Sequence, residues 1–104
     1  MTEEMLNILV QCRENDVPVA LVTIVSTRGS TPCKAGTRML VFADGRTWGT
    51  IGGGCAESEA KLKALTALDQ SHSCMVTISL FDGYAAEAGM VCGGTMDVFI
   101  QAVQ

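Results

Sequence analysis

Several features that mark specialised protein classes are scarce or missing in this sequence. Its 104 residues contain two prolines, one tryptophan, one tyrosine and a single histidine, His72. With one histidine and no Cys-x-x-Cys pair, a structural zinc site is not expected. No Ser/His/Asp set, paired-carboxylate arrangement or metal-ligand cluster is recognisable either. The sequence therefore favours a non-catalytic binding or carrier protein over a self-sufficient hydrolase or oxidoreductase.

The chain also lacks a membrane or export signal. Its longest apolar stretch is Val17–Val25, far shorter than the roughly 20 residues that a bilayer requires. The first residues, Met1 to Glu4, are acidic and are not followed by the apolar segment of a signal peptide. The cysteines are odd in number and widely spaced, which suits a reducing compartment: Cys12, Cys33, Cys55, Cys74 and Cys92. A cytoplasmic protein without membrane contact is expected.

Charge and hydropathy narrow the choice of partners. The net charge of −4 argues against nucleic acid as a ligand. Residues 26–55 nevertheless carry four basic residues and one acidic residue, a local net charge of +3. This segment suits a small anionic ligand, although a solvated strand face is equally consistent with it. The apolar share of 48% predicts a sticky surface, and hence a homodimer or another partner.

Periodicity predicts two helices and five strands in one domain, residues 1–104. The order is α-β-β-β-α-β-β, an α+β fold with a mixed, mostly antiparallel sheet. Thr2 is expected to cap a helix that ends at Asn15-Asp16, and Asp44-Gly45 is expected to form a hairpin turn. The second helix is expected over Cys55–Asp69. The expected strands are 19–25, Thr37–Phe42, Arg46–Ile51, Ser73–Phe81 and Thr95–Val103, with polar loops over Ser26–Gly36 and Asp82–Gly94.

Apolar residues define the faces that these elements are expected to bury. Met5, Ile8, Leu9 and Cys12 form one stripe on the first helix. The strand from residue 19 is apolar on both faces, so it is expected to be central and covered on both sides. On the second helix the expected buried residues are Leu62, Leu65 and Leu68, with Ala60 and Ala64.

The first candidate site is the strand–loop–helix junction at Gly52, Gly53, Gly54 and Cys55. Three glycines leave backbone N–H groups uncovered, and the helix start adds a partial positive charge, so the junction can cradle an anion. Cys55 near that helix start is expected to favour its thiolate, which can ligate a soft metal, hold a persulfide or attack an electrophile. A tight turn with a small filler cysteine is the alternative. Glu57 is either a dipole partner of the helix or an acid of the site.

Two further segments join this candidate. Cys92, Gly93 and Gly94 again place a thiol beside bare backbone, just before a strand. The loop from Ser26 to Pro32 combines hydroxyl groups, Arg28 and a glycine, which suits either phosphate binding or an ordinary capped turn. Trp48 lies four residues before the first glycine loop, so a ligand bound there is expected to quench its fluorescence.

Four ordered motifs give the sequence a family resemblance. They read VSTRGSTP at 25–32, AGTRMLV at 35–41, GTIGGGCAE at 49–57 and CGGTMDV at 92–98. Together they resemble the XdhC/CoxI family, accessory factors of xanthine dehydrogenase and carbon monoxide dehydrogenase. The resemblance implies a chaperone that binds the molybdenum cofactor as cargo, protects it, assists its sulfuration and delivers it to a molybdenum hydroxylase apo-enzyme.

The resemblance also implies which residues form the site. Cys55 and Cys92 become expected molybdenum or sulfur contacts, and the expected cofactor-binding residues are Gly52, Gly53, Gly54, Cys55, Glu57, Cys92, Gly93, Gly94, Ser26, Arg28, Ser30 and Arg38. Family members usually continue into a Rossmann-like domain. This chain is expected to lack that domain, so a separate Rossmann-domain protein and a sulfurtransferase are expected partners. Cys33 stands where the family usually has a basic residue.

Two other functions compete with the chaperone hypothesis. A persulfide carrier or sulfurtransferase would rely on a readily alkylated Cys55. A non-catalytic docking subunit of a larger maturation complex would bind only its protein partner. The sequence does not name the client enzyme or the exact form of the cofactor.

Overall fold

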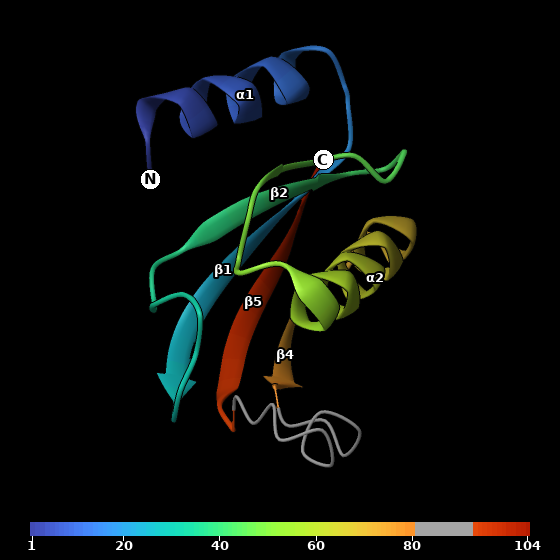
Figure 1. The fold of residues 1–104 in the computed structure, drawn as a ribbon. Helices are drawn as coiled ribbons and strands as arrows, with labels where there is room; N and C mark the ends of the chain where they lie inside the picture. The colour runs from blue at the N-terminus through green and yellow to red at the C-terminus, as the bar shows by residue number, and fades with distance from the viewer. Residues whose placement is uncertain (81–92) are drawn as a thin grey trace.

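The order of helices and strands follows the sequence-based expectation. A computed structural model of the chain describes residues 1–80 and 93–104. Within them lie α1 (Glu3–Glu14), β1 (Val19–Arg28), β2 (Arg38–Phe42), β3 (Thr47–Gly49), α2 (Gly54–Gln70), β4 (Cys74–Ser79) and β5 (Thr95–Val103). The α+β class and the element order are thereby confirmed (Figure 1). None of the described helices is long and apolar enough to cross a membrane.

The strands form one sheet in the order β3-β2-β1-β5-β4, and each pair of neighbours in it is antiparallel. The predicted turn at Asp44-Gly45 joins β2 to β3. Gly45 has a φ of +92°, which an L side chain rarely adopts, and the Phe42 N–H donates to the Arg46 carbonyl at 2.8 Å. The hairpin is therefore confirmed, and β1 occupies the centre of the sheet as expected.

Helix α1 covers one face of the sheet through its predicted apolar stripe. The Thr2 hydroxyl caps the helix by accepting the Met5 N–H at 3.1 Å. Met5 and Cys12 are buried, and they pack with Val19, Leu21 and Leu40 of the sheet. Because alternate residues of a strand point to opposite faces, the other set of β1 side chains points toward α2. The ribbon of β2 accordingly passes between the two helices in Figure 1.

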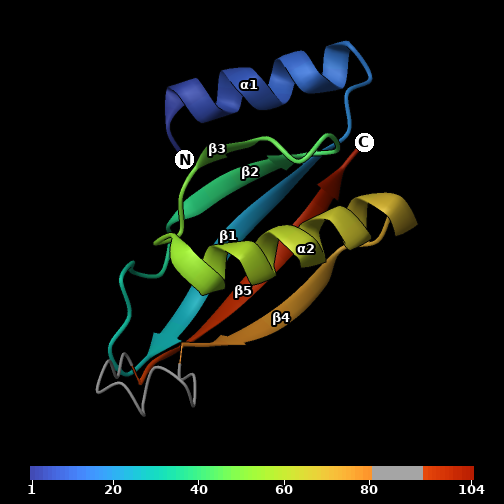
Figure 2. The ribbon, with the colours of Figure 1, turned by 45° about the vertical axis from the view of Figure 1, so that its right-hand side comes forward.

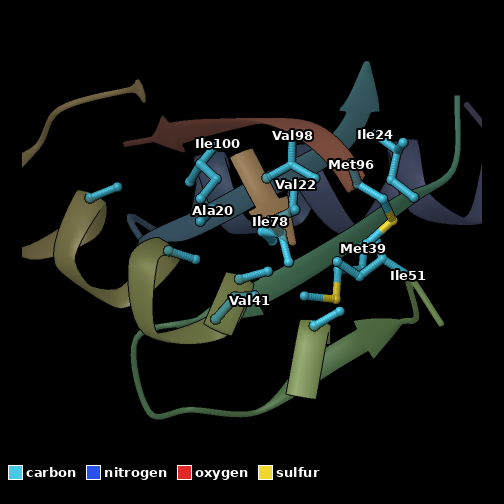
Figure 3. Close-up of a cluster of buried hydrophobic side chains, with 14 of the residues drawn as sticks. Ala20, Val22, Ile24, Met39, Val41, Ile51, Ile78, Met96, Val98 and Ile100 are labelled. Atoms are coloured by element: carbon cyan, nitrogen blue, oxygen red, sulfur yellow. The ribbon is translucent and has the colours of Figure 1, made fainter. Parts of the chain in front are cut away.

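Helix α2 buries mainly alanines against the sheet. Ala60 and Ala64 are fully buried, beside strand residues such as Val22, Met96 and Ile100 (Figure 3). The expectation for Leu62 was wrong, because its side chain is 66% exposed. The remaining alanines of this face, Ala56 and Ala67, are buried as well, with Leu68. Small side chains on this stripe let the helix lie close to the sheet, and Leu62 falls on the opposite side of the helix.

Several strand boundaries differ from expectation, and two of the differences lie near the candidate site. The residues from Ser26 to Arg28 belong to β1 rather than to the predicted loop, because a bulge between Ile24 and Ser26 carries the pairing with β5 onward. Strand β3 ends at Gly49, two residues before the predicted Ile51. Gly49 has a φ of +81°, and Ile51 leaves the sheet to become fully buried beneath α2.

Candidate functional site

Three loop segments meet at the end of the sheet where β1 ends and β5 begins. This is the lower end of the ribbon in Figure 2, from which the loop after β1 rises toward the start of α2. Outside the named strands, Ser30 and Gly93 form an isolated parallel bridge. The loop 29–33 therefore runs directly beside the second glycine segment, Gly93-Gly94.

The contact between this loop and the second glycine segment is backbone against backbone. A Cβ on Gly29 would lie 3.0 Å from the Gly93 carbonyl oxygen. A Cβ on Gly94 would lie 2.7 Å from the Ser30 carbonyl carbon and closer still to its oxygen. Real Cβ atoms essentially never come as close to backbone as one at Gly94 would, so Gly94 requires glycine. Gly29 combines a tight contact with a φ of +73°, which L side chains rarely adopt. The close contact with Ser30 is thus the physical reason for Gly94 in the second motif.

The same loop touches the first glycine segment with its other residues. A Cβ on Gly52, whose φ is +121°, would lie 2.5 Å from Pro32 Cγ and 3.9 Å from Cys33 Sγ. The two predicted glycine segments thus share one neighbour, the loop 29–33, which packs against both. Cys92 of the second motif lies outside the described residues, so its predicted place at this site stays a prediction.

The next two glycines, in contrast, border open space. Within residues 1–80 and 93–104, no atom beyond the immediate chain neighbours lies within 4 Å of the position that a Cβ on Gly53 or Gly54 would take, and both residues have positive φ. Gly53 is the N-cap of α2 and provides no side-chain cap. The first N–H groups of a helix have no partner within the helix, and its dipole adds partial positive charge there. With Cys55 exposed beside them, these groups offer an anion site next to a thiol.

Glu57 fixes the strand-to-loop passage that leads to these glycines. Its carboxylate accepts a hydrogen bond from the Thr50 hydroxyl and another from the Ile51 N–H at 3.1 Å. The Thr50 hydroxyl in turn accepts the Gly52 N–H at 3.1 Å. The bond from Thr50 holds the pKa of the Glu57 carboxyl below its ordinary value, and the N–H groups of Ile51 and Gly53 act in the same direction against the effect of burial. Glu57 therefore acts as an ionised anchor of the loop.

Replacing Glu57 by glutamine is expected to loosen this loop without unfolding the domain. The amide keeps the shape of the side chain but removes the charge that strengthens its hydrogen bonds. Hydrogen exchange at the Ile51 N–H is expected to accelerate by about tenfold, while global stability falls by about 1 kcal/mol or less. Glu59→Gln, on the same helix and exposed, is the control. Unchanged exchange at Ile51 in Glu57→Gln would contradict the anchoring role.

Ser26 and Arg28, two predicted site residues, are bonded to Asp97 of β5. Asp97 accepts from the Ser26 hydroxyl at 2.8 Å, from Arg28 Nη1 at 2.8 Å and from the Thr77 hydroxyl at 2.8 Å. These bonds, that of Arg28 foremost, lower the pKa of Asp97 to about 2. The Arg28 side chain is still 60% exposed, but its guanidinium is paired with Asp97. Arg46 is similarly paired with Asp44. Two of the four basic residues in the segment 26–55 therefore already have a carboxylate partner within the protein.

Asp97→Asn is expected to lower stability in a pH-dependent way. Because the folded-state pKa of about 2 lies below the unfolded value of about 3.9, the contribution is complete above about pH 4 and is lost as the pH falls through 2. The urea midpoint of the variant should therefore lie below that of wild type at pH 5, and the gap should narrow toward pH 2. Asp69→Asn controls for the loss of one exposed charge. A gap of constant size would contradict this assignment.

Arg38 and Trp48 lie on the other side of the sheet. Arg38 pairs with Thr23, and Trp48 pairs with Leu40, whose side chain packs beneath α1. Gly52, in contrast, follows Ile51, which is buried beneath α2. The structure thus separates Arg38 from the glycine loops, and it makes Trp48 a poor reporter of a ligand bound there.

The four described cysteines differ in accessibility. Cys55 is exposed, Cys12 is buried, and Cys33 and Cys74 are half-buried. No group of three potential metal-ligating side chains is present among residues 1–80 and 93–104. Cys55 is therefore the most accessible thiol in the described part of the chain. The Cys33 thiol lies beside Gly52, in the glycine loop that precedes Cys55.

Sequence reasoning missed three residues that build the site. Pro32 fills the space that the absent Gly52 side chain leaves, Asp97 holds Ser26 and Arg28, and Thr50 links Glu57 to the loop. A usable signal existed for Asp97, because it alternates with Met96 and Val98 on a strand whose other face is apolar. The contact of Pro32 joins residues twenty positions apart and has no local pattern.

Comparison with known proteins places the chain in a family. The model of the XdhC and CoxI family matches residues 12–79. The chain is 40% identical over 87 residues to the uncharacterized protein YqeB of Escherichia coli (strain K12), covering 84% of this chain and 16% of YqeB. Its fold is similar to that of a crystal structure described as a xanthine dehydrogenase from Bacillus halodurans, with a TM-score of 0.74 and 27% identity, covering 94% of this chain and 30% of that one. The chain spans less than a third of either relative. Since the family model matches more than half of its residues, the chain belongs to the XdhC and CoxI family.

Proposed function

We propose that this chain binds the molybdenum cofactor as cargo and takes part in the maturation of a molybdenum hydroxylase. Membership of the XdhC and CoxI family supports a role in molybdoenzyme maturation. The similarity to a Bacillus halodurans protein described as a xanthine dehydrogenase points to the same class of client. Because the chain spans only part of its relatives, the activity and partners of those whole proteins enter here as part of the proposal.

The junction at the start of α2 is the observation that carries this proposal. Gly53 and Gly54 carry no side chain, the first N–H groups of α2 have no partner within the helix, and the exposed thiol of Cys55 follows directly. The cargo is an anionic, phosphorylated pterin that carries a soft, thiophilic metal. N–H donors at a helix start suit its phosphate, and a thiolate suits its molybdenum. The residues present therefore fit the cargo, with Glu57 and Thr50 holding the loop in place.

The proposed role has three steps, which are protection, sulfuration and delivery of the cofactor, and they differ in the protein partners that they need. Protection of the cofactor requires only this junction, whereas sulfuration requires a sulfurtransferase and delivery requires the apo-hydroxylase. The predicted homodimer and a separate Rossmann-domain protein belong to the same proposal. Cys92, which lies outside the described residues, is the second proposed thiol contact; Gly93 and Gly94, which follow it in the sequence, lie next to the loop 29–33.

Cofactor retention tests the proposal. Freshly released molybdenum cofactor is mixed with the protein under anaerobic conditions, and molybdenum and pterin are measured in the protein peak after gel filtration. Wild type is expected to retain both in equal amounts, and Cys55→Ser is expected to retain at least about tenfold less. Cys74→Ser, a half-buried thiol on β4, is the matched control. No retention by folded wild type would overturn the proposed function.

A persulfide carrier is the second candidate, and the exposure of Cys55 favours it. No side chain of the two preceding residues covers this thiol, since both are glycine. A carrier should accept sulfur on Cys55 from a persulfide donor in the absence of cofactor. Mass spectrometry would detect the added sulfur atom, and its absence from Cys55 after such treatment would reject this candidate.

A further inference from the structure

A hollow lies on the α1 face of the sheet, beneath the N-terminal end of α1. Its volume is about 390 Å³, and its lining includes Thr2, Met5, Gly36, Thr37, Arg38 and Trp48. This volume falls within the range of small-molecule pockets. The glycines and the thiol of the proposed cargo site are not part of the lining, so the pocket is a separate place on the molecule.

Arg38 is the ionisable side chain that gives this pocket its character. The residue is half-buried at the start of β2, and its Nη1 donates to the Gly36 carbonyl at 3.2 Å. The ion pairs within the described residues join Arg28 to Asp97 and Arg46 to Asp44, so Arg38 has no carboxylate partner there. A guanidinium in a partly buried position favours an anion, and its planar fork matches a carboxylate.

The rest of the lining is suited to a flat apolar group. Trp48 is half-buried and packs with the cluster beneath α1, which includes Met5 and Leu40. An indole ring stacks well on another ring, and a methionine thioether adapts to the edge of one. Glu3 and Glu4 lie in the first turn of α1 and are exposed, outside the lining. The pocket thus combines one unpaired cation with an aromatic and apolar wall.

We propose that this pocket binds a small organic anion with a flat apolar body, of the class of aryl carboxylates. The carboxylate is held by the Arg38 guanidinium, and the ring lies against Trp48 and Met5. This site is independent of the cargo site at the start of α2, and it neither requires nor implies cofactor binding. Arg38 is separated from the glycine loops and cannot serve the cargo site there. Binding of an anion in this pocket gives it a function.

Fluorescence of Trp48, the single tryptophan, reports on this pocket directly. The probe is 4-nitrobenzoate, whose nitrophenyl group quenches an indole, and the matched neutral probe is 4-nitrobenzyl alcohol. Saturable quenching by the anion is expected, with at least about tenfold weaker binding of the alcohol. Arg38→Met keeps the aliphatic stem and should weaken the binding of 4-nitrobenzoate by at least about tenfold. Arg46→Met, which removes an arginine at the β2–β3 turn, should leave it unchanged.

A second measurement needs no variant and therefore does not depend on how Arg38→Met folds. The NMR methyl signal of Met5 should shift on addition of 4-nitrobenzoate, while that of Met96, which is buried on the α2 side, should not. Quenching that stays linear and equal for both probes would overturn the proposal. So would unchanged affinity in a folded Arg38→Met variant, or saturable binding that shifts Met96 and not Met5.

Discussion

Gly94→Ala is expected to destabilise the domain by about 3 kcal/mol or more. A Cβ at this position would overlap the backbone of Ser30 and would lie 2.9 Å from Thr31 Cγ2. Backbone on both sides of the contact leaves no flexible side chain that could yield, so the loop 29–33 must move as a whole. Since a domain of this size is stable by only about 5–15 kcal/mol, a large fraction of its stability is at risk. Urea unfolding monitored by circular dichroism measures the loss.

Gly36→Ala is the matched control for this prediction. Gly36 lies in the connection between β1 and β2 that also contains the loop 29–33, and its φ is +95°. In the described part of the chain, no atom beyond its neighbours lies within 4 Å of the position that a Cβ would take. Alanine there pays only for its left-handed backbone conformation, about 1–2 kcal/mol. Gly94 does not share this constraint, because its φ is not among the positive ones. A smaller loss for Gly94→Ala than for Gly36→Ala would contradict the close packing of the two loops.

Ala64→Leu is expected to cost about 3 kcal/mol, whereas Leu62→Ala should change stability by less than about 0.5 kcal/mol. Ala64 lies on the face of α2 that packs against the sheet and is fully buried, whereas Leu62, two residues earlier, is 66% exposed. The inserted isobutyl group would push the helix away from β1 and β5, on which it packs. Deleting the leucine side chain removes little buried surface and adds a better helix former. The same urea titration applies, and a larger loss for Leu62→Ala would reverse the assigned faces.

The alanine face of α2 shows why this helix was only partly predictable. Leucine periodicity indicated that a helix would form, and the helix spans Gly54–Gln70, one residue beyond the prediction at each end. The prediction was right for Ala60, Ala64 and Leu68, which are buried. It was wrong for Leu62, which lies on the opposite side of the helix. A helix that packs close to a sheet has room only for small side chains on the face between them. How close the helix lies depends on the tertiary structure and cannot be read from its own sequence.

Elements with local signals were predicted well. The Thr2 cap and the apolar stripe of α1, the turn at Asp44-Gly45 and the bounds of β5 are all as expected. Each depends on residues within a few positions of one another. The end of β1 was missed because Ser26 and Arg28 are polar, and their partner Asp97 lies about seventy residues later in the chain.

The candidate site was predictable in composition but not in arrangement. Glycine clusters and a cysteine at a helix start pointed to the first loop, whose openness at Gly53 and Gly54 agrees with that reading. Sequence could not show that the loop 29–33 joins the two glycine segments, because this contact links three distant parts of the chain. Nor could it place Arg38, since one residue of register decides which face of the sheet a side chain occupies.

Protection of Cys55 from alkylation tests the central claim most directly. Iodoacetamide is added to protein that has retained molybdenum cofactor and to cofactor-free protein, and the modification rate at each cysteine is followed by mass spectrometry. The cargo is expected to slow the modification of Cys55 by at least about tenfold and to leave that of Cys74 unchanged; Cys92 is expected to follow Cys55. Equal rates at Cys55 in loaded and cofactor-free protein would contradict the placement of the cofactor at the start of α2.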